Sequence, residues 1–110
     1  AVAHAHLAYY RAMERRGAMR MIRTKSDLTT HVAAYEANSQ TTPLGYILTM
    51  EGADPLLSPD TVDEFYQHGL RCLGLTHYGT NRYGGGTRSH AGLSFSAIEL
   101  LKRCSNLGIT

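Results

Sequence analysis

The sequence predicts an α/β fold in which parallel strands alternate with helices. Two apolar runs, residues 44–50 and 70–76, are continuous enough to form strands that are covered on both faces. A helix-forming segment separates the two runs, and other helical segments precede the first run and follow the second. Because this alternation is typical of right-handed βαβ units, the strands are expected to lie parallel in one sheet.

The first third of the chain is expected to hold two helices with a short strand between them. Apolar residues at helical spacing predict a helix over residues 1–16, and Gly17 would end it. Residues 19–23 would form the strand, and Ser26 would cap the second helix. The buried face of that helix would consist of apolar residues at helical spacing, namely Leu28, Val32 and Tyr35.

Two more helices are expected in the remainder of the chain. Ser58-Pro59-Asp60 predicts a helix start, because it joins a cap, a proline at the first helical position and a carboxylate near the positive end of the dipole. Residues 77–95 form a long glycine-rich loop in this interpretation, and Ser96-Ala97-Ile98-Glu99 fits a capping box. Gly108 would stand past the end of that last helix, where residues 109–110 open another strand. The inward face of the helix would consist of Leu100, Leu101, Cys104 and Leu107.

The composition is that of a globular, core-forming chain and argues against several classes of protein. Of the 110 residues, 43% are hydrophobic and 18% are charged, and the net charge of +2 is too small to indicate a nucleic-acid partner. No apolar run is long enough to span a bilayer, and no signal-peptide pattern is present. Cys72 and Cys104 are not in a metal-type spacing, which favours buried free thiols and a reducing compartment.

Two side chains with acid–base or metal-binding chemistry follow the two central strands. Glu51 directly follows the first run, and His77 directly follows the second. Because the carboxyl ends of parallel strands open on one face, where α/β folds place their chemistry, the two side chains are expected to lie close together. Alternation along the first strand would place Gly45, Ile47, Thr49 and Glu51 on one face of that strand. Alternation along the second would likewise place Arg71, Leu73, Leu75 and His77 on one face of that strand. If both faces look into a barrel, the carboxylate and the imidazole project from its mouth together. The plainer alternative is that both are loop residues.

Other polar motifs carry less information. His4-Ala5-His6 looks like a paired-histidine ligand motif, but residues two apart diverge on the helix predicted there. Gly84-Gly85-Gly86 lacks the lysine of a phosphate-binding loop, so a mobile loop beside the site is the favoured interpretation. Asp54 is expected to serve a turn or to support Glu51 from further out. The histidines without a partner in spacing are expected at the surface, namely His31, His68 and His90.

Several segments resemble, in order and spacing, the renal (membrane) dipeptidase family. They are GYILTMEGAD at residues 45–54, FYQHGLR at 65–71 and LTH at 75–77. The likeness continues through GLS at 92–94 and the segment that ends at Ile109. It implies a (β/α)8 TIM-type barrel, which needs about 250 residues when complete. The chain would then hold about half of such a barrel, as one segment of a larger dipeptidase-like domain of the bacterial branch.

The same resemblance implies a zinc-dependent dipeptidase with two Zn²⁺ ions and a dipeptide substrate. On it, Glu51 corresponds to the carboxylate that bridges the two ions, and His77 to the histidine that faces the substrate and stabilises the tetrahedral intermediate. The other ligands of the family have no counterpart here and would lie before Ala1 and after Thr110. Residues 1–110 alone are therefore expected to be inactive. A cytoplasmic location is expected, and a homodimer is a candidate assembly.

Two other classes of function stay open at this point. A non-catalytic relative could keep the barrel and bind peptides or a partner protein, and substitution of the missing ligands would favour it. An α/β domain that binds phosphate or sugar is the third class, which an anion bound at residues 84–86 would favour.

Overall fold

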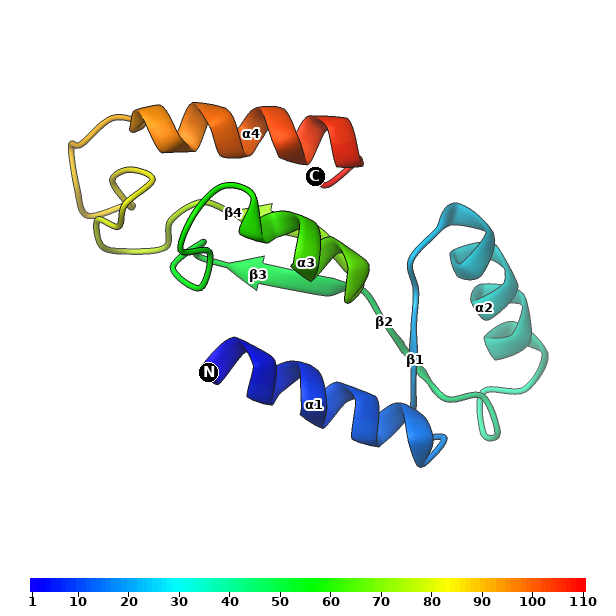
Figure 1. Ribbon diagram of the computed structural model, residues 1–110. Helices are drawn as coiled ribbons and strands as arrows, with labels where there is room; N and C mark the ends of the chain where they lie inside the picture. The colour runs from blue at the N-terminus through cyan, green and yellow to red at the C-terminus, as the bar shows by residue number, and fades with distance from the viewer. The chain divides into compact units, whose positions relative to one another are not determined.

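The computed structural model describes residues 1–110, which form two compact units, residues 1–48 and residues 49–110. In each unit a helix connects two neighbouring strands (Figure 1). The strands are short and the fold is α/β, as the alternation of apolar runs and helical segments predicts. The barrel that the family resemblance implies stays a prediction.

The first unit pairs two short parallel strands through the helix that connects them. Its elements are α1 (Val2–Arg15), β1 (Met19–Met21), α2 (Lys25–Ala37) and β2 (Leu44–Tyr46). The register sets Met19 opposite Leu44 and Met21 opposite Tyr46. The Ile22 N–H extends this ladder by donating to the Tyr46 carbonyl over 2.8 Å. The predicted strand at 19–23 is therefore confirmed in a shorter form.

The cap of α2 is Thr24, and the prediction of Ser26 is wrong. The Thr24 hydroxyl accepts a hydrogen bond from the Asp27 N–H at 3.0 Å, and the Asp27 carboxylate accepts one from the Thr24 N–H at 3.0 Å. This reciprocal capping box satisfies two backbone donors that the first turn leaves without partners, which a cap at Ser26 would not do. The Arg23 N–H also donates to Asp27, and these bonds hold the pKa of that carboxyl below its usual value.

The face of α2 that meets the strands also differs from the prediction. Leu28, Val32 and Tyr35 are 43%, 44% and 51% exposed. His31, expected at the surface, is only 7% exposed and lies against Gly45 of β2. Helical spacing identifies an apolar stripe, but the position of the helix over the strands decides which side is covered. A Cβ atom at Gly45 would overlap the His31 ring, so this close approach requires glycine.

The apolar run at 44–50 forms two strands, because the ladder is interrupted at Ile47. β2 ends at Tyr46, and β3 (Leu48–Glu51) pairs with β4 (Leu70–Gly74) in a separate sheet. Past the strand ends, the Gly52 N–H donates to Gly74 and the Ala53 N–H to Leu75, at 3.0 and 2.9 Å. These bonds advance in the same direction along both segments, as in a parallel pair.

The second unit continues with α3 (Thr61–Gln67) and α4 (Phe95–Leu107), which pack against each other, and α3 also packs against β4. Thr110 also pairs with β4: its N–H donates to Arg71 at 3.0 Å, and its carbonyl accepts from Leu73 at 2.8 Å. This is the bonding of a parallel bridge, so the predicted start of another strand is confirmed. The buried core of this unit includes Val62, Phe65, Leu70, Ala97, Leu100 and Cys104, together with Ala53, Leu56, Tyr83 and Ile109.

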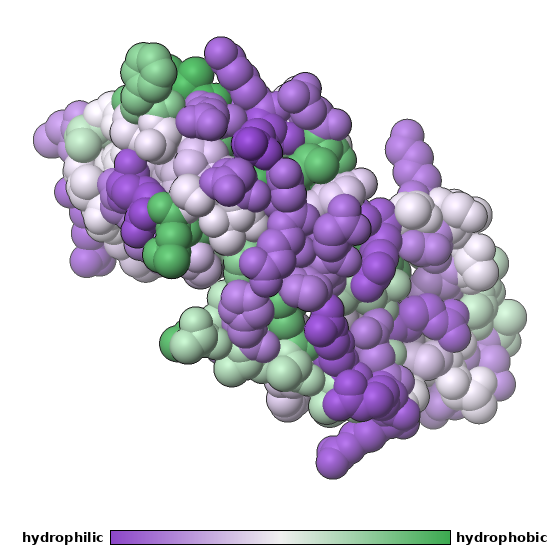
Figure 2. All heavy atoms as spheres, in the orientation of Figure 1, coloured by the Kyte–Doolittle hydropathy of each residue, from purple (hydrophilic) through white to green (hydrophobic).

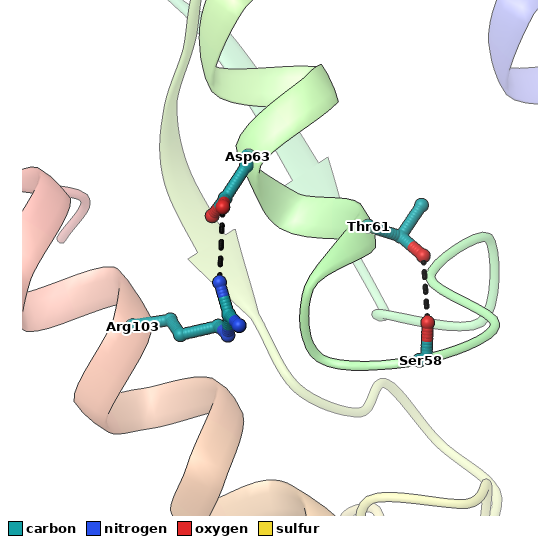
Figure 3. Close-up of polar contacts among 4 residues, drawn as sticks. All are labelled: Ser58, Thr61, Asp63 and Arg103. Atoms are coloured by element: carbon teal, nitrogen blue, oxygen red, sulfur yellow. Dashed lines mark hydrogen bonds and ion pairs between the residues drawn. The ribbon is translucent and has the colours of Figure 1, made fainter.

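The helix start at α3 is shifted from the predicted position. Ser58-Pro59-Asp60 forms a turn in which the Thr61 N–H donates to the Ser58 carbonyl at 3.1 Å, and α3 begins at Thr61. The Ser58 and Thr61 hydroxyls are 3.1 Å apart (Figure 3). Figure 3 also shows Arg103 of α4 reaching Asp63 of α3 at 2.9 Å. Because both charged groups are exposed, this ion pair adds little to stability.

Two predictions for α4 are wrong, and one is confirmed. The cap is Ser94, whose hydroxyl accepts from the Ala97 N–H at 3.2 Å, so Ser96 lies inside the helix. Leu101 is 43% exposed, and hydrophobic residues stand among hydrophilic ones at the surface over α4 (Figure 2). Gly108 adopts φ 75°, the left-handed conformation expected of a residue just past a helix end.

The contact between His31 and Gly45 makes the first prediction. Gly45→Ala should lower the free energy of unfolding by about 1–3 kcal/mol, because the added methyl group overpacks the interface of α2 with β2. Chemical denaturation of the full-length protein measures the change. Gly92→Ala is the matched control, because a Cβ atom at Gly92 meets nothing within 4 Å. Equal stability of the two variants would contradict the close approach of the His31 ring.

Candidate functional site

The structure brings together the two side chains that the sequence singles out. Glu51 is the last residue of β3, and His77 lies three residues past the end of β4. The Nδ1 atom of His77 is 2.7 Å from the Oε1 atom of Glu51, and these side chains are 48% and 74% exposed, respectively. The predicted proximity is confirmed. Their roles toward a metal and a substrate stay predictions.

His77 reaches Glu51 by a path that simple alternation does not describe. β4 ends at Gly74, so the two-residue period does not continue through Leu75 to His77 as expected. Within β4 itself the alternation can hold, and the guanidinium of Arg71 lies 4.2 Å from the centroid of the Tyr66 ring on α3. The segment that follows Gly74 bends, and this bend carries His77 to the Glu51 carboxylate.

Hydrogen bonds to main-chain carbonyls connect the start of the loop that carries His77 to the middle of the same loop. The Thr76 hydroxyl donates to the Gly85 carbonyl at 3.0 Å. The Thr87 N–H donates to His77 and the Arg88 N–H to Tyr78, both at 3.0 Å. These bonds tie the start of the loop to its middle. The sequence contains no signal for them, because their acceptors are main-chain carbonyls.

Tyr78 flanks the imidazole. The ring centroids of His77 and Tyr78 are 3.9 Å apart with an angle of 65° between planes, an edge-on contact. The guanidinium carbon of Arg88 is 5.0 Å from the Tyr78 ring centroid, within reach of a cation–π interaction. The three side chains therefore form a layered group that restricts the orientation of the His77 ring on one side.

The glycine run is explained by close packing of the backbone. A Cβ atom at Gly85 would lie 2.5 Å from the Ala91 carbonyl oxygen, and one at Gly86 would overlap the backbone of His77 and Tyr78. The N–H groups of Gly84 and Gly85 already donate to Asn81 and Ala91. A phosphate-binding loop needs such N–H groups to face the anion, so the arrangement weighs against that function.

A hollow of about 350 Å³ lies beside Glu51. Its lining comes from β3, β4 and the paired end of the chain: Thr49, Met50, Glu51, Cys72, Leu73, Gly74 and Thr110. The volume is within the range of small-molecule pockets. Glu51 thus has a cavity on one side and His77 as a direct neighbour.

The other residues singled out in the sequence lie within helices or strands or in loop hydrogen bonds. His4 and His6 lie within α1, as predicted. The Asp54 carboxylate accepts a hydrogen bond from the Asn81 side chain at 3.2 Å. Both cysteines are free, and burial raises the pKa of the Cys104 thiol, whereas Cys72 is only half-buried. None of the helices combines the length and the apolar character needed to cross a bilayer.

A family model described as "Membrane dipeptidase (Peptidase family M19)" matches residues 5–109. The chain belongs to the membrane dipeptidase family. It is also 36% identical over 72 residues to an "uncharacterized protein in PQQ-III 3'region" of Acinetobacter calcoaceticus. That match covers 57% of this chain and 23% of the relative, so the chain spans about a quarter of the length of that protein. Family membership confirms the resemblance drawn from residues 45–54, 65–71 and 75–77.

Proposed function

We propose that the chain supplies part of the active site of a zinc-dependent dipeptidase, in which Glu51 bridges two Zn²⁺ ions and His77 contacts the dipeptide. The observation that carries the proposal is the 2.7 Å contact of these two side chains at the carboxyl ends of neighbouring strands. In α/β folds this edge is where reactive groups gather. Membership of the membrane dipeptidase family supplies the class of reaction, hydrolysis of a peptide bond.

The residues present fit a metal site. The Glu51 side chain is 74% exposed, and its Oε1 atom faces His77. A carboxylate has two oxygens, so one exposed to this degree could join two cations. A carboxylate oxygen belongs to the set of ligands that bind Zn²⁺. A two-metal centre needs more ligands than Glu51 alone supplies, so other parts of the full-length protein would complete it.

Each side chain has a distinct task in this proposal. Bound zinc ions supply Lewis acidity and lower the pKa of water to near neutrality. Glu51 would hold the ions at the strand edge, next to the hollow that can receive part of a dipeptide. His77 would donate a hydrogen bond to the scissile carbonyl oxygen as negative charge develops on it. Tyr78, packed edge-on against the imidazole, would keep that donor in one orientation.

The role of Glu51 is tested by Glu51→Gln in the full-length protein. This variant keeps the shape of the side chain but removes its charge, so it should retain the fold while zinc content and dipeptide turnover are lost. Metal analysis, circular dichroism and a dipeptide hydrolysis assay measure the three properties. Glu99→Gln, at an exposed position on α4, is the matched control and should behave like the parent. Parental turnover in Glu51→Gln would show that Glu51 is not a metal ligand.

The role of His77 is tested by His77→Ala. Loss of an oxyanion donor typically lowers kcat by about 10²–10³-fold, or roughly 3–4 kcal/mol, so a decrease of this size is expected. Zinc content should stay at the parental level, because the proposal gives His77 no bond to the metal. His90→Ala, an exposed histidine further along the same loop, is the control. Zinc loss in His77→Ala would instead identify His77 as a metal ligand, and peptide binding without turnover in the parent would favour a non-catalytic function.

A further inference from the structure

We propose that Asn81 is a positioning residue for Glu51 and His77, because it ties together the two segments that leave β3 and β4. The structural part of this inference stands on hydrogen bonds within residues 49–110. Its effect on turnover rests on the proposed dipeptidase function.

The carboxamide of Asn81 uses all of its hydrogen-bonding groups. Its Nδ2 atom donates to the Leu75 carbonyl at 2.8 Å and to the Asp54 carboxylate at 3.2 Å. Its Oδ1 atom accepts from the Tyr83 N–H at 2.9 Å. The side chain thus contacts both the segment after β3 and the segment after β4. Because two partners are acceptors and one is a donor, a carboxylate at this position could not replace the amide.

These bonds close a ring at the point where the regular ladder stops. The Leu75 carbonyl, which accepts from Asn81, also accepts from the Ala53 N–H at 2.9 Å. Ala53 adjoins Asp54, the other acceptor of Asn81, so the ring is Ala53, Leu75, Asn81 and Asp54. In the sequence, Ala53 lies two residues after Glu51, and Leu75 lies two residues before His77. Each of the two main-chain members of the ring thus lies two positions along the chain from one of the functional side chains.

The ring is anchored in the core on one side and exposed on the other. Ala53 and Tyr83 are both 0% exposed, and the Tyr83 hydroxyl donates to the Leu56 carbonyl at 2.6 Å in a buried bond. Asp54 is exposed. No strand ladder continues to His77, because β4 ends at Gly74. Asn81 thus adds a side-chain hydrogen bond to the Leu75 carbonyl beside the last main-chain bond from Ala53, and its second bond, to Asp54, links the path that leads to His77 with the path that leaves Glu51.

The test is Asn81→Asp in the full-length protein with zinc. This variant keeps the acceptor for Tyr83 but loses both N–H donors and sets a carboxylate against Asp54 and the Leu75 carbonyl. Because misplacement of a catalytic group by about 1 Å can cost on the order of a hundredfold, kcat should fall by roughly tenfold to a hundredfold. Zinc content and KM should stay at the parental values. Loss of metal or of substrate affinity in place of kcat would overturn a positioning role.

A second readout does not depend on activity. The ¹⁵N resonance of His77 Nδ1, assigned by its absence in His77→Ala, should shift in Asn81→Asp toward its position in Glu51→Gln, because the first change displaces His77 from the Glu51 carboxylate and the second removes that carboxylate. If the parent fails to hydrolyse dipeptides, the proposed function is wrong. The resonance still tests whether the hydrogen bonds of Asn81 fix the position of His77 relative to Glu51. An unshifted Nδ1 resonance in a folded Asn81→Asp protein overturns the inference, whatever happens to thermal stability.

Two further variants complete the design. Asn38→Asp is the matched control: the Asn38 amide oxygen accepts from the Gln40 N–H at 3.1 Å in a turn of the first unit, and neither kcat nor the His77 resonance should change. If Asn81→Asp does not fold, Asp54→Ala removes the exposed arm of the ring alone and should shift the His77 resonance in the same direction. The absence of that shift would then overturn the inference.

Discussion

The parallel pairing of β3 with β4 at their carboxyl ends is the interaction on which the candidate site depends. Bonds from Gly52 to Gly74 and from Ala53 to Leu75 are the last main-chain links between the two segments that carry the functional side chains. One reactive residue precedes this point and the other follows it. If the register of the pair slipped by one residue, Glu51 would point to the opposite face and the contact with His77 would be lost.

Beyond these last bonds, the second unit is held by a loop with almost no regular structure but dense hydrogen bonding. Tyr83 is its centre: the ring is fully buried, its hydroxyl bonds to Leu56, and its carbonyl accepts from the Ser94 N–H at 3.0 Å. Burial also raises the pKa of the Tyr83 hydroxyl. Since Ser94 caps α4, the same loop that carries His77 determines where the last helix begins. Gly84, Gly85 and Gly86 allow this packing because they have no Cβ atom.

The contact of Glu51 with His77 itself contributes little to stability, because both groups are exposed to water. Such a pair is better suited to function than to structure. Its polar atoms can exchange their mutual contact for contacts to a metal ion or a substrate at small cost, whereas a buried pair would leave an uncompensated charge. An open hollow lies beside Glu51, and Glu51 itself is part of its lining.

The sequence by itself determined the alternation of helices and strands, the positions of Glu51 and His77 after neighbouring strands, and the family. These features depend on local periodicity and on short motifs, which neighbouring residues specify. The sequence did not determine that the run at 44–50 divides into two strands, and the expectation of one sheet was wrong, because the strands form two separate pairs. Only the tertiary structure decided that His31, and not the stripe of Leu28, Val32 and Tyr35, meets the strands. Residues recur at the same helical spacing on every side of a helix. Which side of α2 is covered therefore depends on how the helix is placed over the strands.

The hydrogen bonds around the site also could not be predicted from the sequence. Thr24 and Ser94 replaced the expected caps, because several polar residues near each helix start could accept the same N–H groups. Asn81 gave no motif, since two of its partners are main-chain groups, the Leu75 carbonyl and the Tyr83 N–H, and the third, Asp54, lies 27 residues away. Main-chain acceptors occur at every position along the chain. Which of them a side chain reaches is therefore decided only when the chain has folded and the distances between segments are set.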